Sequence, residues 1–259
     1  MKILGLLNSN VYGGDGNIPQ QDLFPSRMAP IMAERIGEPV SVATRAVWPT
    51  PTLPAAVARW MAAEDPDLVI FSVQSYWFLY ESIPARLQRQ FGAPGRVVGS
   101  WGLKAAATPW LAHNAGFRWS RDRFQRMFPG RPHFEPGEVI DVARRAISVM
   151  VRDEGAYVAV TGPGGGYEWA ADDRVRVEHE RRRRQVDEAL AEFCRSLHVE
   201  YWPARAARPA TAERSSLQRD GLHLDAEGHR QHASRHLEVA VELCRRAQAH
   251  MAASAGVRS

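Results

Sequence analysis

A serine near the start of the chain, and an aspartate and a histidine near its end, are the residue types that serine-dependent acyl transfer requires. That chemistry needs a hydroxyl on a tight turn, a histidine that takes its proton and an acid that orients the histidine. Ser9 follows the apolar run Ile3 to Leu7 and precedes a glycine-rich stretch, which predicts a strand giving way to a turn. Asp220 and His223 are three residues apart, so on a loop or first helical turn they can face the same way. They are the candidate nucleophile (Ser9), general base (His223) and orienting acid (Asp220).

Taken singly, these signals also fit ordinary structural roles. Serine and asparagine are common turn formers, and aspartate often caps a helix. Metal ligation by Asp220 and His223 is a poorer alternative, because no further His, Cys or carboxylate cluster stands at a familiar ligand spacing.

Together, the motifs and their order resemble the SGNH or GDSL hydrolases. The family's first block, a strand leading into Gly-Asp-Ser, is similar to Ile3 through Gly13, with Leu7-Asn8-Ser9 in place of Gly-Asp-Ser. Its last block, Asp-x-x-His before a glycine-containing helix start, is matched by Asp220 to His223 with Gly228. The resemblance implies cofactor-free hydrolysis of a small-molecule carboxylic ester through an acyl-enzyme on Ser9.

The chain departs from the family where the family's oxyanion donors stand. The third block begins as expected with Pro66-Asp67-Leu68-Val69, but Gln74 and Tyr76 replace its glycine and asparagine. The glycine of the second block falls near Trp48-Pro49, where the proline has no N–H to donate. Losing one oxyanion donor typically costs roughly 2.7–4 kcal/mol of transition-state stabilisation, so we expect substitutes. The candidates are the backbone N–H groups of Ser9 and Trp48, the Gln74 amide and the Tyr76 hydroxyl.

Several further residues are candidates for the substrate pocket. Asn8 and Asn10 flank the serine, and aromatic residues beside the site can form an apolar acyl pocket or simply pack beneath the surface. The glycine-rich run from Gly162 lacks the pattern of a nucleotide-binding loop and is interpreted as a loop at the rim of the cleft. The full set of pocket candidates is Asn8, Asn10, Tyr12, Trp77, Tyr80 and Gly164.

Two other functions stay open at this point. An acyl-enzyme on Ser9 can be attacked by water or by another alcohol or amine, so the same residues also fit a cofactor-free acyltransferase. The altered donor set also fits a non-catalytic binding protein on the same sheet.

The elements that must position these residues alternate along the chain. Five short apolar runs rich in β-branched residues predict strands, at Ile3 to Leu7, Val40 to Ala43, Leu68 to Val73, Tyr157 to Thr161 and His198 to Trp202. Helical periodicity predicts helices at Leu53 to Ala63, Glu138 to Asp153, Val177 to Ser196 and Ala226 to Ala252. This alternation predicts a three-layer α/β/α sandwich with a parallel sheet of about five strands, the SGNH-hydrolase (flavodoxin-like) type. In such sheets functional groups gather outside the carboxyl ends of the strands.

We expect one domain over residues 1–259, because a single α/β domain of this length is common. One segment interrupts the alternation, an aromatic-rich insertion at about 91–136 that is also rich in glycine and proline. Segments of this length inside a domain are often lids or binding elements. Alternatively, it is a subsidiary hydrophobic cluster that covers one face of the sheet.

Composition favours a cytoplasmic protein without nucleic-acid or membrane partners. The net charge of +4 and pI of about 9.4 are mild, and the densest basic run, Arg181 to Arg184, is surrounded by acidic residues as on a solvated helix face. No apolar run approaches the roughly 18 residues of a membrane span, and no leader-like pattern precedes Lys2. Cys194 and Cys244 lie in helical patterns and are interpreted as buried thiols rather than a disulfide or metal ligands.

Overall fold

The computed structural model describes seven continuous ranges of the chain. These are residues 1–12, 18–79, 83–107, 132–153, 155–164, 173–203 and 224–257, together with Gly116, Trp119 and Arg123. Within them, the backbone of Ser9 and Tyr12 is described and their side chains are not.

Five parallel strands form a single sheet with the order β2-β1-β3-β4-β5. The predicted parallel sheet is therefore confirmed. The central strands are buried on both faces and consist almost wholly of apolar residues, as expected for parallel strands covered by helices. The strands are β1 (Lys2–Leu7), β2 (Ser41–Ala46), β3 (Leu68–Ser72), β4 (Tyr157–Thr161) and β5 (Glu200–Trp202).

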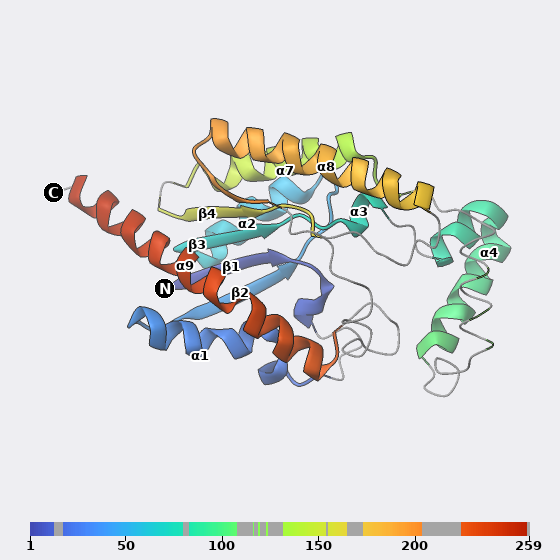
Figure 1. Ribbon diagram of the computed structural model, residues 1–259, viewed down its shortest axis with the longest axis horizontal. Helices are drawn as coiled ribbons and strands as arrows, with labels where there is room; N and C mark the ends of the chain where they lie inside the picture. Colours follow the sequence, from blue (N-terminus) through green and yellow to red (C-terminus); the bar gives the residue numbers. More distant parts are fainter. Residues whose placement is uncertain are drawn as a thin grey trace.

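Helices cover both faces of the sheet, which confirms the three layers (Figure 1). Helix α1 packs against α9 on one face, and α2, α7 and α8 pack together on the other. The alternation of side chains along β1 separates the two cores, because Ile3 faces α1 and α9 while Leu4 and Leu6 face the other layer. The helices are α1 (Phe24–Ile36), α2 (Leu53–Glu64), α3 (Tyr76–Leu79), α4 (Ile83–Ala107), α7 (Pro136–Met150), α8 (Asp173–Ser196) and α9 (Ala226–Val257), with 3-10 turns η1 (Ser9–Tyr12) and η2 (Gln20–Asp22).

Strand β5 is shorter than predicted, because the end of α8 occupies the residues before it. The N–H of Val199 donates to the Cys194 carbonyl at 2.8 Å, and His198 has a left-handed φ of 55°. This arrangement closes a helix C-terminus. His198 therefore belongs to the turn that ends α8, and pairing with β4 begins only at Glu200.

The first part of the expected insertion at about 91–136 is helical. Helix α4 begins before it, at Ile83, continues to Ala107 and is kinked at Gly92, where φ is 63°. Figure 1 shows α4 standing apart from the three layers, beyond the carboxyl ends of the strands. Its Trp101 is 72% exposed. Most of residues 108–131 lie outside the described residues, so the interpretation of this segment as an insertion stays a prediction.

The basic run on α8 is paired with acidic residues, as predicted, but only the side chains of Arg181 and Arg184 are largely exposed, while those of Arg182 and Arg183 are mostly covered. Arg181 and Arg182 both contact Glu178, at 2.7 Å each, and Arg183 contacts Glu180 at 2.6 Å. The hydrogen bonds from Arg181 and Arg182 lower the pKa of Glu178 to about 2.

Among the described helices, none is both long enough and apolar enough to cross a membrane.

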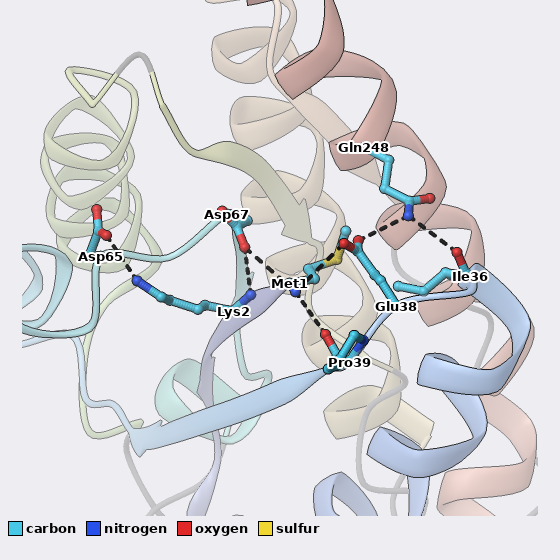
Figure 2. A network of polar contacts seen from close by, with 8 residues as sticks. All are labelled: Met1, Lys2, Ile36, Glu38, Pro39, Asp65, Asp67 and Gln248. Carbon is cyan, nitrogen blue, oxygen red and sulfur yellow. Dashed lines mark hydrogen bonds and ion pairs between the residues drawn. The ribbon is translucent and has the colours of Figure 1, made fainter. Parts of the chain in front are cut away.

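A polar network holds the amino end of β1 in the sheet (Figure 2). The Lys2 N–H donates to the Asp67 carboxylate at 2.6 Å, and the Asp67 N–H returns a bond to the Lys2 carbonyl at 2.9 Å. The Lys2 ammonium contacts Asp65 at 2.9 Å on the surface. The amino group of Met1 donates to the Pro39 carbonyl at 2.7 Å. These bonds fasten β1 to the starts of β2 and β3, at the end of the sheet opposite the predicted site.

Replacing Asp67 by alanine tests which of these contacts stabilises the fold. Asp67→Ala removes a charged acceptor from a backbone donor, and we expect the free energy of unfolding to fall by about 1.5–3 kcal/mol. Lys2→Met is the control, because it removes only the exposed ion pair with Asp65 and keeps the backbone bond to Asp67. Urea unfolding should show a clearly smaller loss for Lys2→Met, and equal losses would contradict this account.

Candidate functional site

Asn8, the residue before Ser9, accepts two hydrogen bonds that close the turn carrying Ser9. The Asn8 carbonyl accepts the Val11 N–H at 3.2 Å, and the Asn8 side-chain oxygen accepts the Asn10 N–H at 3.1 Å. Asparagine is suited to this position because its side chain bonds the backbone two residues on. Asn8 therefore fixes the backbone of the Ser9 turn at the carboxyl end of β1.

Asn8 also links this turn to the end of β3. Its side-chain N–H donates to the Gln74 side-chain oxygen at 3.3 Å. The Gln74 amide nitrogen in turn donates to the Ser72 hydroxyl at 2.7 Å and to the Ser72 carbonyl at 3.2 Å. The chain order reverses between β1 and β3, and ligands bind outside the carboxyl ends of the strands at such a switch point.

A bond from the far end of the sequence reaches the same turn. The Leu224 N–H donates to the Asn10 side-chain oxygen at 2.9 Å, across 214 residues of sequence. Leu224 directly follows His223, and Asn10 directly follows Ser9. The predicted catalytic residues Asp220 and His223 themselves lie outside the described residues, as does the Ser9 side chain.

Helix α9, which follows this segment, is anchored at its first turn. Its N-cap is Asp225, whose carboxylate accepts the Gly228 N–H at 2.7 Å. The fully buried His229 accepts the N–H of Phe24, the first residue of α1, on Nδ1 at 3.2 Å. The first N–H groups of a helix have no partner within the helix, so His229 satisfies one of them. Because Nδ1 accepts this bond, the ring proton of a neutral His229 lies on Nε2.

Sequence reasoning assigned no role to His229, although a signal was present. His229 shares one helical face with Ala233, Ala240, Cys244 and Ala247, all of which are buried. A histidine on the apolar stripe of a long helix indicates a buried hydrogen bond.

The oxyanion candidates lie at the same edge of the sheet. Both N–H groups of the Gln74 amide point to Ser72, so Gln74 would have to release Ser72 to donate elsewhere. Burial raises the pKa of Tyr76, so its hydroxyl keeps its proton and can donate at neutral pH. The donor roles of Ser9 and Trp48 stay predictions.

The pocket candidates fall at different depths. Gly164 is exposed beyond β4. Trp77 is fully buried and packs in the core beneath α7, so contact with a ligand would require it to move. Tyr80 and the Tyr12 side chain lie outside the described residues.

Aromatic side chains gather at this edge around Trp48, which is 43% exposed. The ring of Tyr76 meets it edge-on with centroids 5.3 Å apart, and His133 does so at 5.6 Å. The ring of Phe134 lies 6.3 Å away, and its N–H donates to the Trp77 carbonyl at 3.1 Å. We call these four residues, Trp48, Tyr76, His133 and Phe134, the aromatic wall. The sequence did not predict it, because His133 and Phe134 reach Trp48 only through the fold.

The two thiols are poor nucleophiles. Burial raises the pKa of Cys194 to about 12 and that of Cys244 to about 11, and both are free and buried as predicted. Across the part of the chain that the structure describes, no three His, Cys, Asp or Glu side chains gather as metal ligands would.

The arrangement of the whole chain matches known structures. TesA superimposes with a TM-score of 0.54 at 12% identity, over 94% of this chain and 99% of its own. The chain has the fold of the SGNH hydrolases. The five-stranded parallel sheet with helices on both faces therefore agrees with the predicted fold class.

Other similar structures superimpose less well on this chain. Est24 of Sinorhizobium meliloti, a carbohydrate acetylesterase, has a TM-score of 0.47 at 13% identity over 93% of this chain and 99% of its own. The esterase EstA of Pseudoalteromonas sp. has a TM-score of 0.48 at 9% identity over 90% of this chain and 92% of its own. No protein-family model and no curated protein sequence matches the chain. At 12% identity, the likeness to TesA establishes the fold alone.

The bond between His229 and Phe24 predicts a stability difference along one helix. His229→Leu leaves the buried Phe24 N–H without an acceptor, and we expect a loss of about 1–3 kcal/mol in the free energy of unfolding. The same substitution at the half-buried His232 keeps its apolar contact with Phe24 and should cost less. Denaturant unfolding measures both, and an equal loss at the two positions would refute the assigned role of His229.

Proposed function

We propose that the chain is a serine-dependent carboxylic ester hydrolase. Ser9 attacks the acyl carbon while His223 takes the hydroxyl proton, and the alcohol leaves with that proton. Water then attacks the acyl-enzyme, gives its proton to His223, and releases the acid and the free Ser9 hydroxyl. Asp220 orients His223 and stabilises its charged form. No cofactor takes part in these steps.

The observation that carries this proposal is the bond from Leu224 to Asn10. Leu224 follows His223 and Asn10 follows Ser9, so each end of the bond is one residue from a proposed catalytic residue. Consecutive Cα atoms are only about 3.8 Å apart. The first and last motifs of the sequence thus have neighbours in direct contact at the carboxyl edge of the sheet. This contact supports the proposal that the side chains of Ser9 and His223 meet.

Two further findings support ester chemistry. The fold is the one that the sequence motifs implied, and the Ser9 turn lies at the switch point of the sheet, where ligands bind in open α/β sheets. At the same edge, the Asn8 amide, which donates to Gln74, and the buried Tyr76 hydroxyl are the donor groups that we assign to a developing oxyanion.

A fluorophosphonate probe tests the nucleophile. We expect covalent labelling of the wild-type protein and none of Ser9→Ala, because only an activated serine hydroxyl attacks the phosphorus. The matched control is Ser75→Ala, which removes another serine at the same edge and should leave labelling intact. Labelling of Ser9→Ala at the wild-type level would refute the proposal, and absence of labelling in both proteins would favour a binding protein.

Asn10 gives a second prediction. Asn10→Leu removes the acceptor of the Leu224 N–H and should slow labelling about tenfold, which corresponds to about 1.4 kcal/mol. Asn10→Asp keeps an acceptor oxygen and should remain within about threefold of the wild type, a difference below about 0.7 kcal/mol. Both rates are measured by quenching the labelling reaction at set times and quantifying the adduct by mass spectrometry. Equal rates for the two variants would show that this contact does not position the site.

A further inference from the structure

Trp48 stands beside the turn that carries Ser9. The register of β1 and β2 pairs Leu7 with Ala46, and the Val47 N–H donates to the Leu7 carbonyl at 3.0 Å. Trp48 directly follows Val47, and Ser9 lies two residues after Leu7, where β1 gives way to a 3-10 turn. Trp48 and the Ser9 turn therefore leave the sheet at the carboxyl ends of two neighbouring strands.

The other members of the aromatic wall contact the Trp48 ring from two chain segments. Tyr76 comes from the start of α3, while His133 and Phe134 come from the segment that precedes α7. The rings of Tyr76 and His133 stand at 81° and 82° to the Trp48 ring, so each of these contacts joins the edge of one ring to the face of the other. Two chain segments thus support one ring that remains 43% exposed.

Trp48 combines contacts to three other rings with a partly exposed ring surface. A large apolar side chain needed only for packing is normally buried, as Trp77 is in the neighbouring core. Apart from the His133 imidazole, the rings of the wall carry no group that is charged at neutral pH, so most of this surface suits an uncharged ligand. Aromatic rings bind such groups by apolar contact and by stacking.

We infer that the aromatic wall binds an uncharged apolar part of the substrate, an aromatic ring or a hydrocarbon chain, with Trp48 as the residue that determines this specificity. The inference rests on the proposed function for its placement beside the reacting ester. The polar groups of Asn8 and Tyr76 then face the ester group while the wall holds its apolar substituent.

Equilibrium binding tests the wall without any hydrolysis. In the Ser9→Ala background, the neutral fluorescent probe N-phenyl-1-naphthylamine should bind, and Trp48→Ala should raise its Kd about tenfold. Trp101→Ala is the matched control, because Trp101 is an even more exposed tryptophan outside the wall, and it should leave the Kd unchanged. Trp48→Phe keeps a ring and should retain most of the affinity, which separates loss of the surface from misfolding.

Hydrolysis gives the second arm. The ratios of kcat/KM for benzyl acetate to ethyl acetate, and for ethyl phenylacetate to ethyl acetate, should exceed one in the wild type. Trp48→Ala should lower at least one ratio about tenfold, because it removes the ring that contacts the apolar group of the substrate. The substitution keeps the main-chain N–H of residue 48, so this oxyanion candidate is not removed.

The two proposals fail in distinguishable ways. If neither ratio moves and probe binding is the same in Trp48→Ala and Trp101→Ala, the inference about the wall is overturned while ester hydrolysis stands. If the probe binds in a Trp48-dependent way but no ester is hydrolysed, the wall stands as an apolar binding site and the proposed reaction is refuted.

Discussion

One hydrogen bond, from the Leu224 N–H to the side chain of Asn10, joins the two ends of the sequence at the carboxyl edge of the sheet. The packing of α1 against α9 supports it, and the bond from Phe24 to His229 anchors the first turn of α9 a few residues further along. Catalytic residues from the start and the end of a chain need a contact that fixes their relative position, because the reaction rate falls steeply when catalytic groups are misplaced. The long helix α9 thus stabilises the fold, and the residue two positions before it, Leu224, bonds the turn that follows β1.

The order of the strands provides the second half of this geometry. Because β1 lies between β2 and β3, the residues after all three strands meet around the Ser9 turn. Asn8 contacts Gln74, which follows β3, and Val47, which precedes Trp48, bonds the Leu7 carbonyl at the end of β1. Two of the departures from the family pattern, Trp48 and Tyr76, lie in ring contact with each other.

The sequence predicted the sheet, the four long helices with clear periodicity and the buried thiols, because apolar periodicity reports burial directly. It did not predict α1, whose Pro25 and Pro30 weaken the helical signal although Pro25 is suited to the first turn. It also missed α4, where glycines and prolines resemble a loop. The contacts of Asn8 with Gln74, and of Trp48 with His133, join residues that are far apart in the sequence. They depend on the tertiary fold, which local sequence patterns do not encode. The direct meeting of Ser9 with His223 stays a prediction.

The most direct test of the central claim is a crystal structure of the protein after reaction with a small fluorophosphonate. The account predicts a phosphorus bonded to the Ser9 hydroxyl oxygen, with a ring nitrogen of His223 within hydrogen-bond distance of the adduct, at about 3 Å. Asp220 should accept a bond from the other ring nitrogen. A phosphonyl group on another side chain, or one on Ser9 with the His223 ring out of reach, would contradict the account.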